Sequence, residues 1–171
     1  MAMGNSNLEP DQAQKAWDEL VQRCPLLFRG EDSYWFECGP GWHDLLEELC
    51  FKIEAKLAAM PHDELHYMDS DEKPTRLYYV EQIKEKFATL RFYMDQEPDG
   101  VDNLIAAAEA KSSQTCETCG DPGEPRSMGW HKTCCDKHYQ GYLQEQKERR
   151  ERNAKARAER EAAKTNEPSE E

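Results

Sequence analysis

The chain has 171 residues, of which 37% are apolar and 33% are charged, and its formal net charge is −13. This length suits one domain with appendages, and the low apolar share predicts a modest core. No apolar run is long enough to span a membrane, no secretory leader pattern opens the chain, and seven cysteines are an odd number. We therefore expect a cytoplasmic protein with reduced thiols and no membrane partner.

The charge is unevenly distributed along the chain. Residues 1–145 carry 14 basic and 28 acidic side chains, whereas residues 146–164 carry eight basic and four acidic ones. An acidic protein repels nucleic-acid phosphates and favours basic protein surfaces. The pattern predicts a basic protein partner for most of the chain, with ordinary solubility as the alternative reason for the charge.

Two amphipathic helices are predicted in the first 60 residues. Apolar residues recur at helical spacing from Asp11 to Cys24, and Pro25 ends that helix. The strongest helix begins near Gly41, carries a leucine-rich face and ends before Pro61. Residues 26–41 between them predict a loop or short strand that brings aromatic side chains to the core. These aromatic residues are Phe28, Trp35 and Phe36.

The middle of the chain predicts a loop followed by a hairpin. Residues 61–75 are polar and acidic, and we expect a loop there. Aromatic and β-branched residues then gather in two short runs that predict strands, with a turn near Glu85–Lys86. A helix over Glu81–Ala88 is the alternative interpretation of this stretch.

A third helix is predicted after the break at Gln96–Gly100. Leu104, Ile105 and Ala108 give it an apolar face, and it runs to about Lys111. Asp99 or Asp102 is the expected N-cap, because a short acidic side chain accepts hydrogen bonds from the first free amides.

Four metal-ligand residues stand in two ordered pairs beyond this helix. Cys116 and Cys119 form a Cys-x2-Cys pair followed by Gly120, and Cys135 with His138 forms a Cys-x2-His pair. This is the ligand pattern of a closed tetrahedral zinc site. A glycine permits the tight turn that brings two thiolates to one metal, and residues three apart share a face at the start of a helix. We predict one structural zinc per chain, bound by these four residues.

Several alternatives remain open at this site. Cys134 could replace Cys135 as the third thiolate, and a disulfide or unliganded thiols could replace the metal site altogether. We expect the segment to fold as a knuckle, a short hairpin and a helix, with Trp130 covering the metal. His131 is expected on the hairpin surface.

The last helix loses its apolar face after Leu143. From Glu145 onward, acidic and basic residues stand four apart in the favourable order, which predicts a solvated helix. These pairs are Glu145/Arg149, Glu148/Arg152 and Glu151/Lys155.

Together the elements predict an α+β fold, a small helix-plus-short-sheet domain with a C-terminal treble-clef-like zinc module and a projecting charged helix. The predicted parts are a disordered N-terminus (1–10), the α+β body (11–112), the zinc module (113–143) and a charged helix that frays into a disordered tail (144–171).

Residues 38–140 resemble a family of small, largely uncharacterised phage and prophage proteins. The resemblance is carried by Gly41-Trp42-His43-Asp44-Leu45-Leu46, by Lys84–Phe87 with Leu90–Tyr93, by Ala108-Glu109 with Ser112, and by Cys116–Gly120 with Cys135–His138. It implies a phage-encoded cytoplasmic factor that acts in an infected bacterium, and it implies no reaction.

Enzyme signatures are absent, with one remote exception. His62-Asp63-Glu64 matches the His-x-Glu of zinc deaminases, and Cys116 with Cys119 would supply the two thiolates. No proline precedes Cys116, and Cys135 with His138 competes for the same metal. We therefore expect a protein that is not an enzyme.

For two further groups of residues the sequence allows both a functional role and a purely structural one. Cys24, Cys38 and Cys50 with His43 match no metal-site template, and we expect buried free thiols. The basic residues Lys84, Lys86 and Arg91 lie among aromatic ones, which suits base stacking, although a core role for the aromatics is the stronger expectation. These aromatics are Phe87, Phe92 and Tyr93.

The leading functional prediction is a zinc-stabilised, acidic protein–protein interaction module that binds or inhibits a host protein, such as a nucleic-acid-handling or defence protein. The alternative is a zinc-containing protein that binds nucleic acid through its arginine-rich C-terminal helix. The arginines in question are Arg149, Arg150, Arg152, Arg157 and Arg160.

Overall fold

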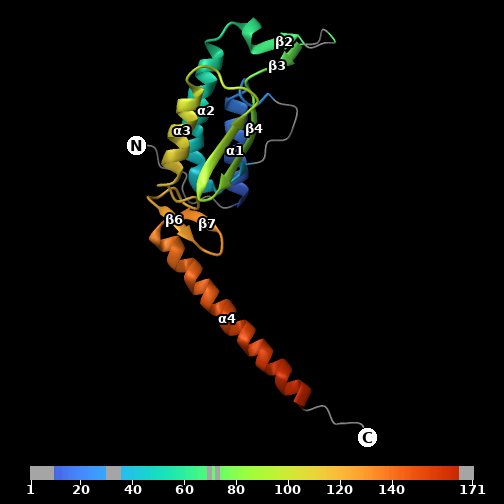
Figure 1. Ribbon diagram of the computed structural model, residues 1–171, viewed down its shortest axis with the longest axis vertical. Coiled ribbons are helices and arrows are strands. Elements are labelled where there is room, and N and C mark those ends of the chain that lie inside the picture. The colour runs from blue at the N-terminus through green and yellow to red at the C-terminus, as the bar shows by residue number, and fades with distance from the viewer. Residues whose placement is uncertain (1–9, 30–35, 69–70, 72–73, 166–171) are drawn as a thin grey trace. The chain divides into compact units, whose positions relative to one another are not determined.

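The computed structural model describes residues 10–29, 36–68, 71 and 74–165, and its fold is α+β (Figure 1). The chain divides into two compact units, Met1–Cys135 and Asp136–Glu171. The predicted disordered N-terminus, apart from Pro10, and the predicted tail after Thr165 lie outside the described residues. None of the helices in the described part is long and apolar enough to cross a membrane.

The first two predicted helices are confirmed. Helix α1 is Pro10–Arg23 and helix α2 is His43–Ala58, preceded by a 3-10 turn at Pro40–Trp42. Glu54 on α2 fixes the segment after α1, since its carboxylate accepts hydrogen bonds from the amides of Leu26 (3.0 Å) and Leu27 (2.9 Å). A charged acceptor makes these bonds strong, so the chain that leaves α1 is held against α2.

Helix α3 is Val101–Ser112, as predicted, but its expected acidic cap is wrong. The N-cap is Gly100, in a left-handed conformation with φ +76°, and no side chain caps this end. Glycine adopts this conformation without the steric cost that a Cβ brings, which explains why the helix begins here.

The central sheet has three strands in the order β1-β4-β5. Strand β1 (Phe36–Glu37) is parallel to β4 (Val80–Lys86), which is antiparallel to β5 (Thr89–Met94). The predicted hairpin is confirmed and the helical alternative over Glu81–Ala88 is wrong. The turn lies at Phe87–Ala88, after the predicted position, and both residues have positive φ (53° and 66°). These are the angles of a tight hairpin turn that usually contains glycine or asparagine.

The prediction of a loop over residues 61–75 is wrong. This stretch contains a 3-10 turn, η2 (His62–Leu65), and two short antiparallel strands, β2 (His66–Met68) and β3 (Pro74–Arg76). The guanidinium of Arg29 donates to the carbonyls of Leu65 (3.1 Å) and Leu77, on either side of the small hairpin. Contacts from a distant residue therefore stabilise strands that the local polarity disfavours.

The core lies between the helices and one face of the central sheet. Helix α2 packs against α1 and α3, and α3 packs against β5 (Figure 1). Trp17 stacks on Phe36 with ring centroids 4.3 Å apart, and Phe28 is buried beside them, so two of the three aromatics predicted to reach the core do so. Trp35 lies outside the described residues. The largest fully buried apolar side chains are Leu20, Leu27, Trp42, Leu46, Ile53, Leu57 and Leu90.

The segment after α3 forms a knuckle and a short hairpin, as predicted. Strands β6 (Glu124–Ser127) and β7 (His131–Cys134) are antiparallel and precede helix α4 (Asp136–Thr165). Helix α4 runs continuously through residue 144. Of the predicted ion pairs, Glu148–Arg152 is present at 4.0 Å, and Lys155 pairs with Glu159 at the same distance.

Candidate metal centre

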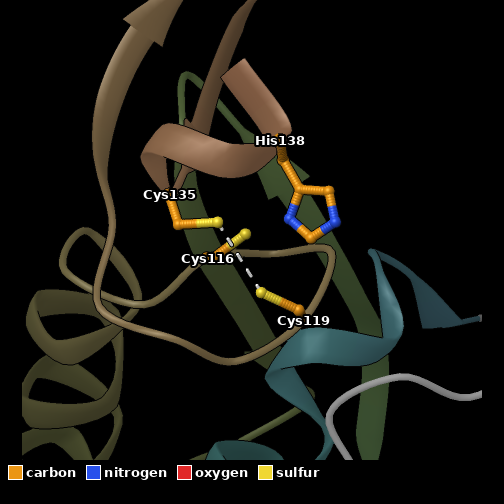
Figure 2. A group of neighbouring side chains, drawn as sticks. All are labelled: Cys116, Cys119, Cys135 and His138. Carbon is orange, nitrogen blue, oxygen red and sulfur yellow. Dashed lines mark hydrogen bonds between the residues drawn. The ribbon is translucent and has the colours of Figure 1, made fainter. Parts of the chain in front are cut away.

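The four predicted ligands come together in space. Donor atoms of Cys116, Cys119, Cys135 and His138 all lie within 4.8 Å of one another, and Figure 2 shows the three sulfurs and the imidazole gathered at one point. The three thiols are buried and the histidine is half-buried. The chain therefore brings together a set of donors that is able to hold a metal ion.

The sulfur spacing fits a metal better than a disulfide. The sulfurs of Cys119 and Cys135 are 3.8 Å apart. Two thiolates at about 2.3 Å from a tetrahedral metal stand about 3.8 Å from each other, whereas a disulfide requires about 2.05 Å. All seven cysteines are free thiols, so the disulfide alternative is wrong.

A tight knuckle positions the first ligand pair. The amide of Gly120 donates to the carbonyl of Cys116 (2.8 Å), and the amide of Cys116 donates to the carbonyl of Asp121 (2.7 Å). Gly120 has φ +78°, which explains why a glycine follows the second cysteine. The thiol of Cys119 also donates to the Asp121 carboxylate at 3.3 Å.

The second ligand pair follows the β6–β7 hairpin. Cys135 comes directly after β7, and His138 lies in the first turn of α4. The neighbouring Cys134 faces elsewhere, because adjacent residues of an extended chain point to opposite sides, and its sulfur contacts Met128 at 3.6 Å. Cys135 and not Cys134 therefore belongs to the cluster.

Trp130, which was predicted to cover the site, is largely exposed to solvent. Its side chain is 60% exposed at the tip of the hairpin, where the amide of Met128 donates to the Trp130 carbonyl (2.7 Å) and closes the turn. Met128 is the buried residue of this turn. His131 is exposed, as predicted.

The knuckle contacts the 3-10 turn that precedes α2. The sequence alone did not reveal this contact. The amide of Gly41 donates to the Glu117 carbonyl (2.8 Å), and the indole N–H of Trp42 donates to the Thr115 carbonyl (2.9 Å). A Cβ on Gly41 would lie 2.5 Å from the amide nitrogens of Cys119 and Gly120 and closer still to the Cys116 carbonyl. Only a glycine permits this approach of two backbones.

A buried carboxylate joins the knuckle to its surroundings. Glu117 is 6% exposed; one of its oxygens accepts a hydrogen bond from the Gly39 amide (2.7 Å), and the other lies 3.6 Å from the Lys132 ammonium. Burial raises the pKa of Glu117, while Lys132 and the Gly39 amide oppose that shift. Since an unpartnered buried carboxylate is costly, these contacts fix the knuckle, the start of α2 and strand β7 together.

The thiol of Cys119 favours its neutral form in the absence of a cation. Burial, with a contribution from the neighbouring Cys116, raises the pKa of Cys119 well above its ordinary value. A bound divalent metal would displace the thiol protons and supply the positive charge that three neighbouring thiolates require.

The other predicted sites are not assembled in the described part of the chain. Cys24 and Cys50 are buried in the core, where burial raises the pKa of Cys24 to about 12, and the Nε2 of His43 lies 3.3 Å from the Ala16 carbonyl. His62 is exposed on η2 beside His66 and does not belong to the metal cluster. The His-x-Glu motif therefore does not meet the cysteines that a deaminase would need.

The aromatic residues of the β4–β5 hairpin divide between core and surface. Phe92 is buried, as the core interpretation predicts, but Phe87 is 70% exposed and Tyr93 is 39% exposed. Lys84 lies 5.4 Å from the Tyr93 ring centroid, and Lys86 lies 5.7 Å from that of Phe87. The arginines of the C-terminal unit are all exposed along α4, where Arg157 pairs with Glu161 at 2.9 Å.

Comparisons of the chain with protein-family models, with curated proteins and with solved structures found no match.

Proposed function

We propose that this protein is a zinc-stabilised protein–protein interaction module, in which the metal has a structural role. The observation that carries the proposal is the closed donor set, three buried cysteines and one histidine within 4.8 Å. A catalytic zinc has three protein ligands and keeps a fourth position open for water, whereas four protein ligands occupy a tetrahedral site completely.

Zinc is the metal that this donor set favours. Three thiolates and an imidazole in tetrahedral array suit zinc or iron–sulfur chemistry, and carboxylate-preferring metals such as magnesium are disfavoured. In this proposal the knuckle, the β6–β7 hairpin and the start of α4 form a treble-clef-like module, and a reducing bacterial cytoplasm keeps the thiols available.

Elemental analysis of the purified protein tests the metal assignment directly. We expect one zinc per chain, lost on treatment with a chelator together with part of the thermal stability. A protein without bound metal, which unfolds identically with and without chelator, would overturn the proposal.

The acidic surface proposed for the partner lies at the C-terminal end of α2. Asp63 and Glu64 are exposed on η2, which follows this helix, and Glu97 is exposed in the segment after β5. The ammonium of Lys56, in the last turn of α2, donates to the Asp99 carbonyl (3.1 Å), which brings the second segment to the same helix end. The knuckle is seated at the opposite end of α2, so the metal and the acidic surface are separated by the length of the helix.

Three carboxylates of α2 itself have partners within the protein. Glu47 pairs with Arg23, Glu48 bonds to Lys52 (2.7 Å) and Lys111 (2.9 Å), and Glu54 accepts two backbone amides. Asp63, Glu64 and Glu97 are the exposed carboxylates that we propose for the partner at this end of the helix. Carbonyl groups at a helix C-terminus carry partial negative charge, so a cationic partner gains from the helix as well.

The proposed partner is a host protein with a basic surface, such as one that handles nucleic acid. An acidic surface would occupy the site that such a protein offers to phosphates, and charge complementarity would set the association rate. The resemblance to phage and prophage proteins supports a bacterial host.

A matched pair of double variants tests the surface. We expect the full-length protein to retain a host protein in a pull-down that weakens with salt, and Asp63→Lys with Glu64→Lys to abolish the retention. The control is Asp18→Lys with Glu19→Lys, an equally adjacent acidic pair exposed on α1. Equal loss in both variants would show a general charge effect, and retention in the first would overturn the assignment.

A second candidate function rests on the exposed arginines of α4. Nucleic-acid binding through Arg149 and Arg150 predicts a gel shift that strengthens at low salt and disappears when both are replaced by alanine. The interaction module predicts no dependence of host-protein capture on these two residues.

A further inference from the structure

The outer face of the central sheet differs in charge from the rest of the acidic chain. Its inner face is apolar, with Ile83, Leu90 and Phe92 buried against the helices. Because side chains alternate across a strand, the intervening residues point to the other face. Among the paired strand residues that the structure describes, that face carries three cations and the carboxylate of Glu37, and Glu81 is exposed at the bulge in β4. The paired residues of this face are Glu37, Gln82, Lys84, Lys86, Thr89, Arg91 and Tyr93.

The cations on this outer face are set directly beside each other. Lys84 stands opposite Arg91 in the strand register, and Lys86 stands opposite Thr89 one step nearer the turn. Like charges in opposed positions cost stability, so this arrangement is not what sheet stability alone would select. Glu109 lies 3.9 Å from Arg91, whose guanidinium also donates to the Thr89 hydroxyl and the Leu90 carbonyl (2.6 Å each). Glu37 stands beside Lys84 in the parallel register, so the charges of Arg91 and Lys84 are partly offset, whereas Lys86 is exposed beside the turn.

Aromatic rings lie at both ends of this basic stretch. Tyr93 stands at one end, opposite Gln82, and Phe87 stands at the other, in the turn. Tyr93 is four strand positions from Thr89, the residue that follows the turn, which corresponds to roughly 13 Å of strand. Each ring has a lysine beside it, at 5.4 Å for Tyr93 and 5.7 Å for Phe87.

The exposed phenylalanine is held in place by the chain beneath it. Phe87 has φ +53°, a conformation that non-glycine residues seldom adopt, and its ring is 70% exposed. The next residue, Ala88, is buried; its amide donates to the Glu85 carboxylate (2.6 Å) and its carbonyl accepts from the Thr133 hydroxyl (2.6 Å). Hydrogen bonds to the amide and to the carbonyl of Ala88 thus hold the turn in place. Less conformational entropy is therefore lost when a ligand binds to it.

We propose that this outer face, called here the basic sheet face, binds single-stranded nucleic acid. Bases stack on the rings of Phe87 and Tyr93, and phosphates contact Lys84, Lys86 and Arg91 between them. A surface that binds single strands of any sequence needs aromatic rings on which bases stack and cations that contact the phosphates. In a duplex the bases stack on each other, so their faces are not accessible to the rings. The inference is independent of the acidic surface proposed above, which lies on other residues.

The test uses the full-length protein and a fluorescent single-stranded oligothymidine of about 12 nucleotides, a length within the range that single-strand binding folds contact. We expect Phe87→Ala and Tyr93→Ala each to weaken binding by about 5- to 150-fold, the range for loss of one stacked base. Lys84→Ala is expected to lower the slope of log affinity against log salt by about 0.7, the value for one phosphate contact on a single strand.

Three controls make the result decisive. Tyr67→Ala removes an aromatic ring that is 49% exposed on β2, and it should leave binding unchanged. Replacing Arg149 and Arg150 by alanine should also leave it unchanged, which separates this face from α4. Metal content and melting temperature should stay constant in every variant, since none of these side chains is buried.

Three results would overturn the inference. One is binding that survives Phe87→Ala and Tyr93→Ala, and another is equal binding of a polyglutamate peptide, which would indicate simple attraction of anions. The third is equal affinity for a duplex of the same length, because a duplex cannot stack on the two rings. The variant with Asp63 and Glu64 replaced should lose host-protein capture and keep its oligothymidine binding. The failure of one proposal can therefore be distinguished from the failure of the other.

Discussion

The interior beneath the central sheet and the metal-binding segment, Thr115–Cys135, are stabilised in different ways. The interior buries large apolar side chains such as Leu46, Ile53 and Leu57. In the metal-binding segment the buried residues are mostly cysteines, with Met128, Thr133 and Glu117. Its contacts with the rest of the unit are largely backbone hydrogen bonds, such as those from Gly41 and Trp42.

This difference shows how two regions of a chain with a low apolar share can each be stabilised. Burial of a large aliphatic side chain contributes about 1.5–3 kcal/mol, and the interior has many of them. The metal-binding segment has few, and in our proposal the free energy of metal binding takes their place. The two regions should therefore respond differently to mutation, to chelation and to pH.

The largest effect is expected from Cys119→Ser. Loss of one of the four donors should release the metal and with it most of a contribution that is about 10–16 kcal/mol in zinc-finger peptides. Hydrogen exchange should show lost protection across Thr115–Cys135 while the centre of α2 stays protected. Cys38→Ser is the control, because that thiol lies outside the cluster. An unchanged metal content and melting curve in the Cys119 variant would refute the site.

A smaller effect, in the opposite region, is expected from Ile53→Ala. This side chain is fully buried in α2, and truncation leaves a cavity that costs about 2–5 kcal/mol. Urea unfolding should show the loss, and the metal content should stay at one per chain. Metal release at the same urea concentration as unfolding of the interior would show that the two regions behave as one.

Gly41→Ala tests the contact that joins the two regions. The added methyl would overlap backbone atoms of Cys119 and Gly120, a strain that costs about 1–3 kcal/mol. We expect weaker metal binding in a competition with a chromogenic chelator, along with reduced stability. The matched control is Gly141→Ala in α4, where nothing lies within 4 Å of the new methyl. Because alanine favours helix over glycine, the control should gain stability by about 0.5–1 kcal/mol.

The smallest effect concerns the ion pair between α2 and α3. Hydrogen bonds from Lys52 and Lys111 lower the pKa of Glu48 to about 2. The pKa of Glu48 in the folded protein lies below its unfolded value of about 4.3. The pair therefore stabilises the protein fully above a pH of about 4.3. Its contribution is lost as the pH falls through about 2.

Replacing Lys111 by methionine should therefore raise the pKa of Glu48 in an NMR titration. Since the pair is exposed to solvent, the cost near neutral pH should stay under about 1 kcal/mol. Metal binding should be unaffected, and a change in it would indicate coupling between the pair and the metal-binding segment.

Periodicity and proline placement were enough to predict α1, α2 and α3. The hairpin of β4 and β5 also followed from its aromatic and β-branched residues, but its turn did not. Phe87 and Ala88 adopt the angles of a glycine-rich turn without containing a glycine, so no local signal marked them. Strands β2 and β3 were missed because Arg29, far away in sequence, anchors the ends of their hairpin.

The four residues of the candidate metal centre were predictable because ligand spacing is local. Each pair lies within four residues, and the knuckle glycine and the start of α4 follow from the same short stretch. The contact between the knuckle and the turn before α2 was not predictable. It depends on Gly39 and Gly41 meeting Glu117 and Cys116 across more than 70 residues, and two glycines beside a proline indicate only a turn when read alone.

The bond from the Trp42 indole to the Thr115 carbonyl also sets an order of events during synthesis. These residues are 73 positions apart in the chain, so α2 leaves the ribosome well before its partner exists. At 5–20 residues per second the interval is roughly 4–15 s. During that time the indole N–H of Trp42 lacks the carbonyl that accepts its hydrogen bond in the folded protein. This contact between the start of the central helix and the knuckle therefore forms only after synthesis has passed Thr115.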